Sequence, residues 1–192
     1  MNPLLQSIAE NHRAAVDGFL HAEHAAIEAL AATCAEAVMG GRKLLFCGNG
    51  GSACDAMHIA GEFVGRFVDD RRALPAIALS ADTGILTAIA NDYAYDYVFA
   101  RQVEALGQAG DVLIALSTSG RSPNVLRALA TARTNGVKTA LFSGEKLRSG
   151  TPVAADFVLV VPSLITAHVQ EAHMVALHAL AALIEAKLFP KA

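Results

Sequence analysis

Two strand-like runs, each followed by a polar loop and a helical pattern, constrain the fold of this chain most strongly. Residues 43–47 form a short apolar run that leads into Gly48-Asn-Gly-Gly-Ser52 and then into a helix. The same order returns at 111–116, followed by Ser117-Thr-Ser-Gly120 and a helix over 122–134. Strands that alternate with helices of this length indicate βαβ units. We therefore predict a parallel sheet with helices on both faces.

The other segments complete this architecture. Further strands are predicted at 76–79, 137–142 and 157–161, and further helices at 84–90, 95–106 and 165–188. The result is an α/β fold, a five-stranded parallel sheet in a flavodoxin-like three-layer sandwich. Residues 3–39 have helical spacing and should form one or two helices ending at Gly40-Gly41. We expect 1–41 to be oligomerisation helices and 42–192 to be the ligand-binding domain, with a mobile loop at 144–152.

Composition excludes several classes of protein. The 192 residues are 54% hydrophobic and have a mean hydropathy of +0.40, yet no apolar stretch reaches the ~18–20 residues that span a bilayer. The surplus apolar surface is best buried against further copies of the chain.

A net charge of −3 without a basic block argues against nucleic acid as a partner. The three cysteines lack disulfide or zinc-finger spacing. With no signal-peptide pattern, we predict a cytoplasmic homo-oligomer without a membrane partner.

Both polar loops are candidate phosphate sites. In open α/β sheets, ligands bind beyond the carboxyl ends of the strands, near the loops that start helices. The first loop has three glycines, which let the backbone approach a ligand, and Ser52 at the start of the next helix. The second loop offers the hydroxyls of Ser117, Thr118, Ser119 and Ser122. Serine and glycine are also ordinary turn and cap residues, but two equivalent loops favour phosphate binding.

Two nucleotide motifs are not met. Gly48-x-Gly50-x-x-Ala53 fits the loose dinucleotide pattern, whose acidic residue should follow about 20 residues on. The next predicted strand ends near Asp82, about thirty residues on, which is too far. No Gly-Lys-Ser/Thr follows the loop, so the P-loop pattern fails as well. A nucleotide-dependent oxidoreductase is therefore disfavoured.

Titratable residues follow the first loop on one helix. Asp55, His58 and Glu62 are spaced three and four apart and share a helix face. His58 and Glu62 could bind a metal ion, or the carboxylate could act as a base. The alternative is an intrahelical pair on a solvated face.

The last predicted helix adds a second group of polar residues to an apolar segment. Gln170 and His178 lie on one stripe of this helix, which suggests that they work as a pair. His173 lies about 140° away from His178 around the helix axis, and we interpret it as structural. A histidine in an apolar helix is often a hydrogen-bonded core residue, so a purely structural role stays open for both His173 and His178.

Taken together, these motifs resemble the sugar isomerase (SIS) domain family, and within it the phosphoheptose isomerase branch. The matching stretches are residues 48–62, 86–92, 110–122 and 170–178. The Ser-Thr-Ser-Gly loop is common to SIS proteins. The combination of His58, Glu62, Gln170 and His178 is much more specific.

The resemblance implies an aldose–ketose isomerase that converts sedoheptulose 7-phosphate to D-glycero-D-manno-heptose 7-phosphate, which feeds bacterial surface heptose synthesis. It implies a homotetramer with one zinc ion per subunit. The implied phosphate-binding residues are Ser52, Ser117, Thr118, Ser119 and Ser122. The implied sugar-binding residues are Asn49, Gly50, Gly51, Asn91, Asp92 and Gln170. The implied zinc ligands are His58, Glu62, Gln170 and His178. Ala53 stands where some relatives carry His, so we expect no metal or substrate role there.

The residues fit this chemistry. Moving a carbonyl from C2 to C1 through an enediolate needs a base for carbon and an acid for oxygen. We assign Glu62 as the base and His178 as the acid, with zinc polarising the two oxygens. If Glu62 ligates zinc, it becomes a weaker base, so the two roles compete.

The alternative function is a non-catalytic SIS adaptor that binds the bacterial replication initiator protein. Such adaptors resemble this chain in residues 86–92 and in the Ser-Thr loop. They lack an acid and an imidazole at the positions of Glu62 and His178, and both are present here. The sequence therefore favours the isomerase.

Overall fold

A five-stranded parallel sheet forms the centre of the molecule, which is described by a computed structural model covering residues 2–150 and 152–190. The strands are β1 Leu44–Gly48, β2 Ala76–Ala78, β3 Val112–Ser117, β4 Lys138–Gly144 and β5 Phe157–Val161. Their order across the sheet is β2-β1-β3-β4-β5, and every neighbouring pair is parallel. The predicted fold class is confirmed.

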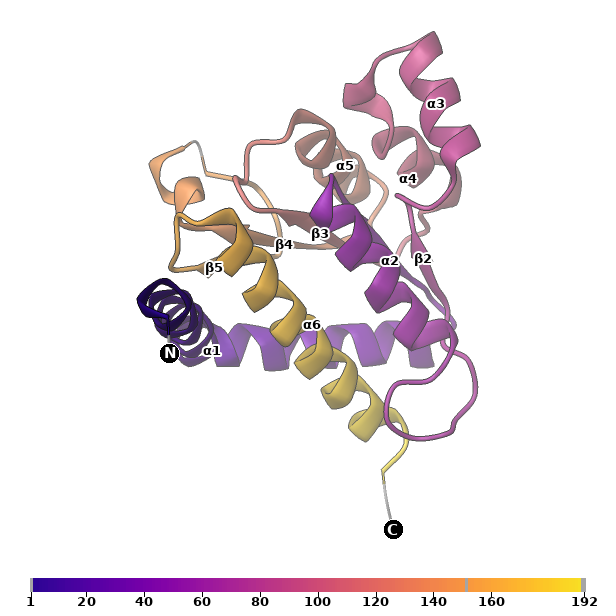
Figure 1. Cartoon of the computed structure of the whole chain (residues 1–192). Helices are drawn as coiled ribbons and strands as arrows, with labels where there is room; N and C mark the ends of the chain where they lie inside the picture. The colour runs from indigo at the N-terminus through magenta and orange to yellow at the C-terminus, as the bar shows by residue number, and fades with distance from the viewer. Residues whose placement is uncertain (1, 151, 191–192) are drawn as a thin grey trace.

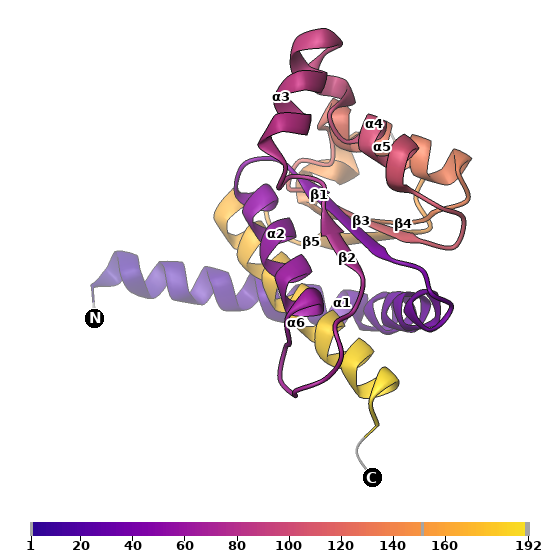
Figure 2. The ribbon, with the colours of Figure 1, turned by 90° about the vertical axis from the view of Figure 1, so that its right-hand side faces the viewer.

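Helices cover both faces of the sheet (Figures 1 and 2). They are α1 Pro3–Met39, α2 Gly51–Val64, α3 Thr83–Asp92, α4 Ala100–Leu106, α5 Pro123–Thr134 and α6 Thr166–Leu188. One core joins α1, α2 and α6 to the face that carries Phe46 and Ile114. The other joins α4 and α5 to the face that carries Leu45 and Leu113. Because the strands are buried on both faces, they read as continuous apolar runs in the sequence.

The 3–39 segment is one helix, α1, of 37 residues. Figure 1 shows its first part end-on and the rest from the side, whereas Figure 2 reverses the two views, so the helix bends. The side chain of Asn2 accepts a hydrogen bond from the Leu4 N–H and caps its start. From Ala15 onward α1 carries buried residues that pack on α6 and the sheet, while its first turns are exposed.

The predicted helix over 95–106 is wrong as a single element. The structure divides it into a 3-10 turn, η1 Tyr95–Tyr97, and the short helix α4. Val98 and Phe99, between the two, are completely or almost completely buried against the sheet. The chain turns at these residues because both side chains enter the core.

Other predicted limits differ by a few residues. The helix after the first loop ends at Val64, because Gly65 follows it as the C-cap and terminates the helix before the sequence pattern does. The predicted loop at 144–152 contains a further 3-10 turn, η2 Glu145–Ser149. Residue 151 of that loop lies outside the described residues.

Candidate active site

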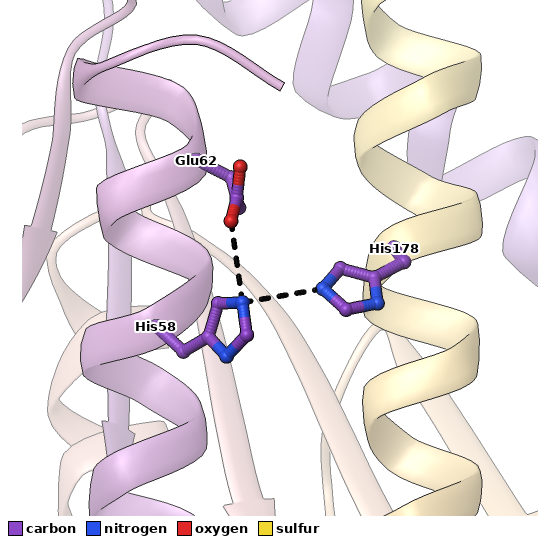
Figure 3. Close-up of side chains that lie close together, drawn as sticks. All are labelled: His58, Glu62 and His178. Atoms are coloured by element: carbon purple, nitrogen blue, oxygen red, sulfur yellow. Dashed lines mark hydrogen bonds and ion pairs between the residues drawn. The ribbon is translucent and has the colours of Figure 1, made fainter. Parts of the chain in front are cut away.

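Three of the predicted metal ligands meet between α2 and α6 (Figure 3). His58 and Glu62 project from α2, and the Nε2 atom of His58 lies 3.2 Å from the Glu62 Oε1 atom. His178 projects from α6, and its Nε2 atom lies 3.4 Å from that of His58. One potential ligand atom from each of the three residues lies within 4.8 Å of the others. The helices thus bring two imidazoles and one carboxylate to a single point.

The chemistry of this donor set fits zinc. Two imidazole nitrogens and a carboxylate oxygen are ligands that zinc accepts, and three protein ligands leave a position open for water or substrate. His58 and Glu62 are one turn apart on α2 and face the same side. The ring of Phe67 stacks against the His178 ring with a centroid distance of 5.6 Å, which limits the rotation of that imidazole.

Asp55 lies one turn before His58 on α2. Burial raises the pKa of its carboxyl group, and the charge of His58 partly offsets that rise. Its Oδ2 atom is buried without a hydrogen-bond partner among the described residues. The carboxyl is therefore a second acidic group beside the imidazole of His58.

Gln170, the fourth predicted ligand, lies at the other end of the α2–α6 contact. A Cβ atom added to Gly51 would overlap the Gln170 Nε2 atom, so the amide occupies the space that this glycine leaves open. Gly50, which precedes Gly51 in the chain, has a φ of 56°, in the left-handed region that favours glycine. Ser52 is buried in the first turn of α2. The first loop therefore packs closely against the glutamine of α6.

The second loop presents its hydroxyls at the start of α5. The hydroxyl oxygens of Ser117 and Ser122 lie 3.2 Å apart. The Ser119 hydroxyl accepts a hydrogen bond from the Arg121 N–H at 3.2 Å. The carbonyl of Thr118 accepts one from the Gly144 N–H at 3.1 Å. The N-cap residue of α2, Gly50, has no side chain to cap the helix, so the start of α2 keeps backbone donors for an anion. At the start of α5, Pro123 has no N–H and the Val125 N–H donates to the Asn124 side chain at 2.9 Å, so the loop hydroxyls are its main polar groups.

Asn91 and Asp92, the last two residues of α3, are exposed. The side-chain amide of Asn91 donates a hydrogen bond to the Asp92 carboxylate at 2.8 Å. α3 has no buried residue and projects beyond the sheet (Figures 1 and 2). The structure therefore places these two residues on a surface of the single chain, apart from the cluster of Figure 3.

Known proteins resemble this chain over most or all of its length. A family model described as "SIS domain" matches residues 9–144. The phosphoheptose isomerase of Bradyrhizobium sp. (strain ORS 278) is 50% identical over 191 residues, covering 100% of this chain and 94% of the relative. The chain belongs to the phosphoheptose isomerase family. It is an isomerase with an SIS domain, as the resemblance predicted.

Solved structures agree with this membership. A phosphoheptose isomerase from Francisella tularensis superposes with a TM-score of 0.86 at 33% identity, over 96% of this chain and 98% of that one. The phosphoheptose isomerase from Neisseria gonorrhoeae gives a TM-score of 0.80 at 37% identity, over 95% and 99% of the two chains. Within the described residues of this family member, no helix is long and apolar enough to cross a membrane.

Asn124 joins the two phosphate-loop candidates and was missed by sequence reasoning. Its amide and that of Asn49 exchange hydrogen bonds of 2.9 and 2.8 Å, which tie the loop after β1 to the start of α5. The Tyr95 hydroxyl also donates to the Asn49 carbonyl oxygen, at 3.0 Å. Asn124 is 2% exposed. Its position just after Ser-Pro at a helix start was the available signal, but its partner lies far away in the sequence.

A buried ion pair holds α2 against α6. The Arg71 Nε–H donates to the Glu185 carboxylate at 2.9 Å, and the two side chains are only 4% and 7% exposed. Arg71 also donates to the backbone carbonyls of Glu62 and Phe63, at 2.7 and 2.9 Å, and so caps the last turn of α2. One side chain therefore fixes both the end of the helix that carries Glu62 and its distance from α6. A glutamate in the apolar final helix was the only sequence signal.

Proposed function

We propose that this isomerase converts sedoheptulose 7-phosphate to D-glycero-D-manno-heptose 7-phosphate. The observation that carries the proposal is the convergence of His58, Glu62 and His178 at one point of a chain whose relatives are phosphoheptose isomerases. The required chemistry is the removal of a proton from C1, its return to C2 and a proton exchange between the two oxygens. A carboxylate and an imidazole whose reactive atoms lie within 4.8 Å of each other can serve adjacent carbons and oxygens.

Glu62 is assigned as the base that takes the C1 proton and returns it to C2. His178 is assigned as the acid, which donates a proton to O2 while O1 loses one. His58 lies between them and orients the carboxylate through the 3.2 Å contact. One proton moves from C1 to C2 and a second moves from O1 to O2, so separate acid and base groups are needed.

Zinc is the proposed cofactor, one ion per subunit. His58, Glu62 and His178 would hold it, and Gln170 is the proposed fourth ligand on the strength of the resemblance and its position on the same stripe of α6 as His178. Zinc supplies Lewis-acid stabilisation of negative charge on the enediolate oxygens. Ligation by Glu62 would lower its basicity, so its assignments as ligand and base compete.

The two loops are the proposed substrate sites. Ser52, Ser117, Thr118, Ser119 and Ser122 are assigned to the phosphate, and Asn49, Gly50, Gly51, Asn91, Asp92 and Gln170 to the sugar. The uncapped start of α2 supports the phosphate assignment, because its backbone donors favour an anion. The proposed place of action is the bacterial cytoplasm.

A homotetramer is the proposed assembly, with residues 1–41 as its oligomerisation segment and 42–192 as the sugar-phosphate domain. Leu4, Leu5 and Ile8 of α1 are 69%, 56% and 47% exposed in the single chain. α3 buries none of its residues. Apolar surface of this kind is expected to be covered by another copy. Sedimentation should give a species of about four chains, and a stable 20.0 kDa monomer at micromolar concentration would contradict the proposal.

The activity test is direct. The purified chain with zinc is incubated with sedoheptulose 7-phosphate in D₂O, and aldose formation is followed by proton NMR. We expect the aldose to appear, with Glu62→Gln lowering kcat by roughly 100- to 10,000-fold. Glu10→Gln, an exposed carboxylate change on α1, is the matched control and should retain full activity. Absence of aldose from the folded, zinc-loaded wild type would refute the proposal.

A further inference from the structure

His173 of α6 is fully buried beside the phosphate-loop candidate, on a different face of the helix from His178. Its ring packs against those of Phe19 and Phe142, with centroid distances of 6.4 and 5.8 Å. Its Nε2 atom lies 3.2 Å from the backbone carbonyl of Ser143. Because a carbonyl only accepts hydrogen bonds, Nε2 carries the proton in this contact.

The other ring nitrogen indicates that this residue does more than fill the core. The Nδ1 atom of His173 is buried without a hydrogen-bond partner among the described residues. Leaving a buried polar atom unpaired disfavours the folded state, and a leucine or phenylalanine would avoid that penalty. The interaction that a leucine or phenylalanine could not make at this position is the hydrogen bond from Nε2 to Ser143.

Ser143 and Gly144, at the end of β4, support the second loop directly. Ser143 is paired with Ser117 in the register of β3 and β4. The Gly144 N–H donates to the Thr118 carbonyl at 3.1 Å. A Cβ atom added to Gly120 would lie 2.8 Å from the Ser143 hydroxyl oxygen, so the loop rests closely on this strand end. A displacement of Ser143 would therefore move the loop that carries the phosphate-binding hydroxyls.

We propose that His173 is a positioning residue for phosphate binding, because its Nε2–H holds the Ser143 carbonyl and so fixes the strand end that supports Ser117–Gly120. This inference rests on the proposed function in one respect, the assignment of that loop to the substrate phosphate. His173 itself touches neither substrate nor metal. It acts at the back of the loop, on the side of the α1–α6 core.

Three substitutions separate the hydrogen bond from packing. His173→Gln places an amide donor near the position of Nε2, His173→Asn places one near Nδ1 and too short to reach Ser143, and His173→Leu removes the donor. Leu180→Ala, at another fully buried position of α6, is the control for a general loss of stability. Each protein is compared in KM and kcat for the sugar phosphate, in Kd for inorganic phosphate, and in bound zinc.

We expect His173→Leu and His173→Asn to raise KM and the phosphate Kd about tenfold, as for one misplaced hydrogen bond. kcat and zinc content should stay near wild type, and His173→Gln should restore most of the phosphate affinity. Leu180→Ala should lower the melting temperature without this change in KM.

The contradicting results are distinct. Equal phosphate affinity in wild type and all three His173 variants would overturn the role of His173 and leave the proposed function intact. If phosphate affinity falls equally in the Gln, Asn and Leu variants, or falls as much in Leu180→Ala, the effect comes from packing. That result would also overturn the role of His173. If the wild type isomerises the sugar phosphate but KM is unchanged in Ser119→Ala and Ser122→Ala, the loop does not bind the phosphate. That result would overturn both the loop assignment and the role of His173. Absence of both aldose formation and phosphate binding in the wild type would overturn both proposals together.

Discussion

The Nε2 atoms of His58 and His178 face each other at 3.4 Å across the gap between α2 and α6, although the residues are 120 positions apart in the chain. About two turns before them, Gly51 of α2 meets Gln170 of α6. The two helices therefore run side by side in the same direction, since each follows a strand of the parallel sheet. This packing brings the loop residues together at one end and the candidate metal ligands further along.

Removal of either imidazole from this pair should weaken zinc binding. His58→Ala or His178→Ala should raise the zinc Kd by at least about 100-fold. Even the loss of a residue that only hydrogen-bonds a metal ligand lowers metal affinity roughly 10- to 100-fold. Titration with a competing chelator measures the affinity. His21→Ala, which changes an exposed histidine of α1, should bind zinc like wild type. Retained affinity in both site variants would contradict the metal site.

The loop hydroxyls should affect substrate binding more than turnover. Ser119→Ala and Ser122→Ala should each raise KM by about 10- to 100-fold, the loss expected for one hydrogen bond to a charged group. Steady-state kinetics measures KM and kcat together. Ser7→Ala on α1 provides the control, since that exposed hydroxyl accepts a hydrogen bond from Asn11 of its own helix. Unchanged KM values in both loop variants would remove these hydroxyls from the phosphate site.

The Arg71–Glu185 pair should dominate the stability of the α2–α6 contact. Arg71→Met should lower the free energy of unfolding by about 3–5 kcal/mol, because it leaves the Glu185 carboxylate buried and unpaired. The double variant Arg71→Met/Glu185→Leu should recover part of that loss, since both charges are then gone. Urea denaturation measures the free energy of unfolding of the wild type, of the double variant and of each single variant, Arg71→Met and Glu185→Leu. A double variant that loses more stability than the two single variants together would contradict this account.

His173 should make the protein less stable in mild acid. Burial lowers its pKa from 6.5 to about 4, while the hydrogen bond to Ser143 opposes that shift in part. As the pH falls below 6.5, the unfolded chain gains a proton that the folded chain refuses until about pH 4. Over this interval the histidine should remove about 3 kcal/mol of stability.

The pH effect is measured by comparing urea denaturation of wild type and His173→Gln from pH 7.5 down to pH 4. The glutamine variant lacks the titrating ring, so it should lose less stability over this interval. Identical pH profiles for the two proteins would show that the ring does not titrate as expected.

The local elements could be predicted because they depend on short-range periodicity. The run at 43–47 and the loop from Gly48 to Ser52 predict β1 and the start of α2 closely. The spacing of His58 and Glu62 predicts a shared face, since any helix places residues four apart side by side. The break at Val98 and Phe99 was not predictable, because burial against the sheet decided it rather than helical spacing.

The sequence by itself determined the order of strands and helices, the two hydroxyl- and glycine-rich loops, and the His58–Glu62 pair, because each depends on residues close together in the chain. Only the tertiary structure decided that His178 meets this pair, that Asn124 bonds to Asn49, and that Glu185 receives Arg71. It also directed His178 to the candidate site and His173, on another face of α6, to the carbonyl of Ser143. These contacts join distant segments, and they depend on how helices pack on a sheet, which no local pattern of residues specifies.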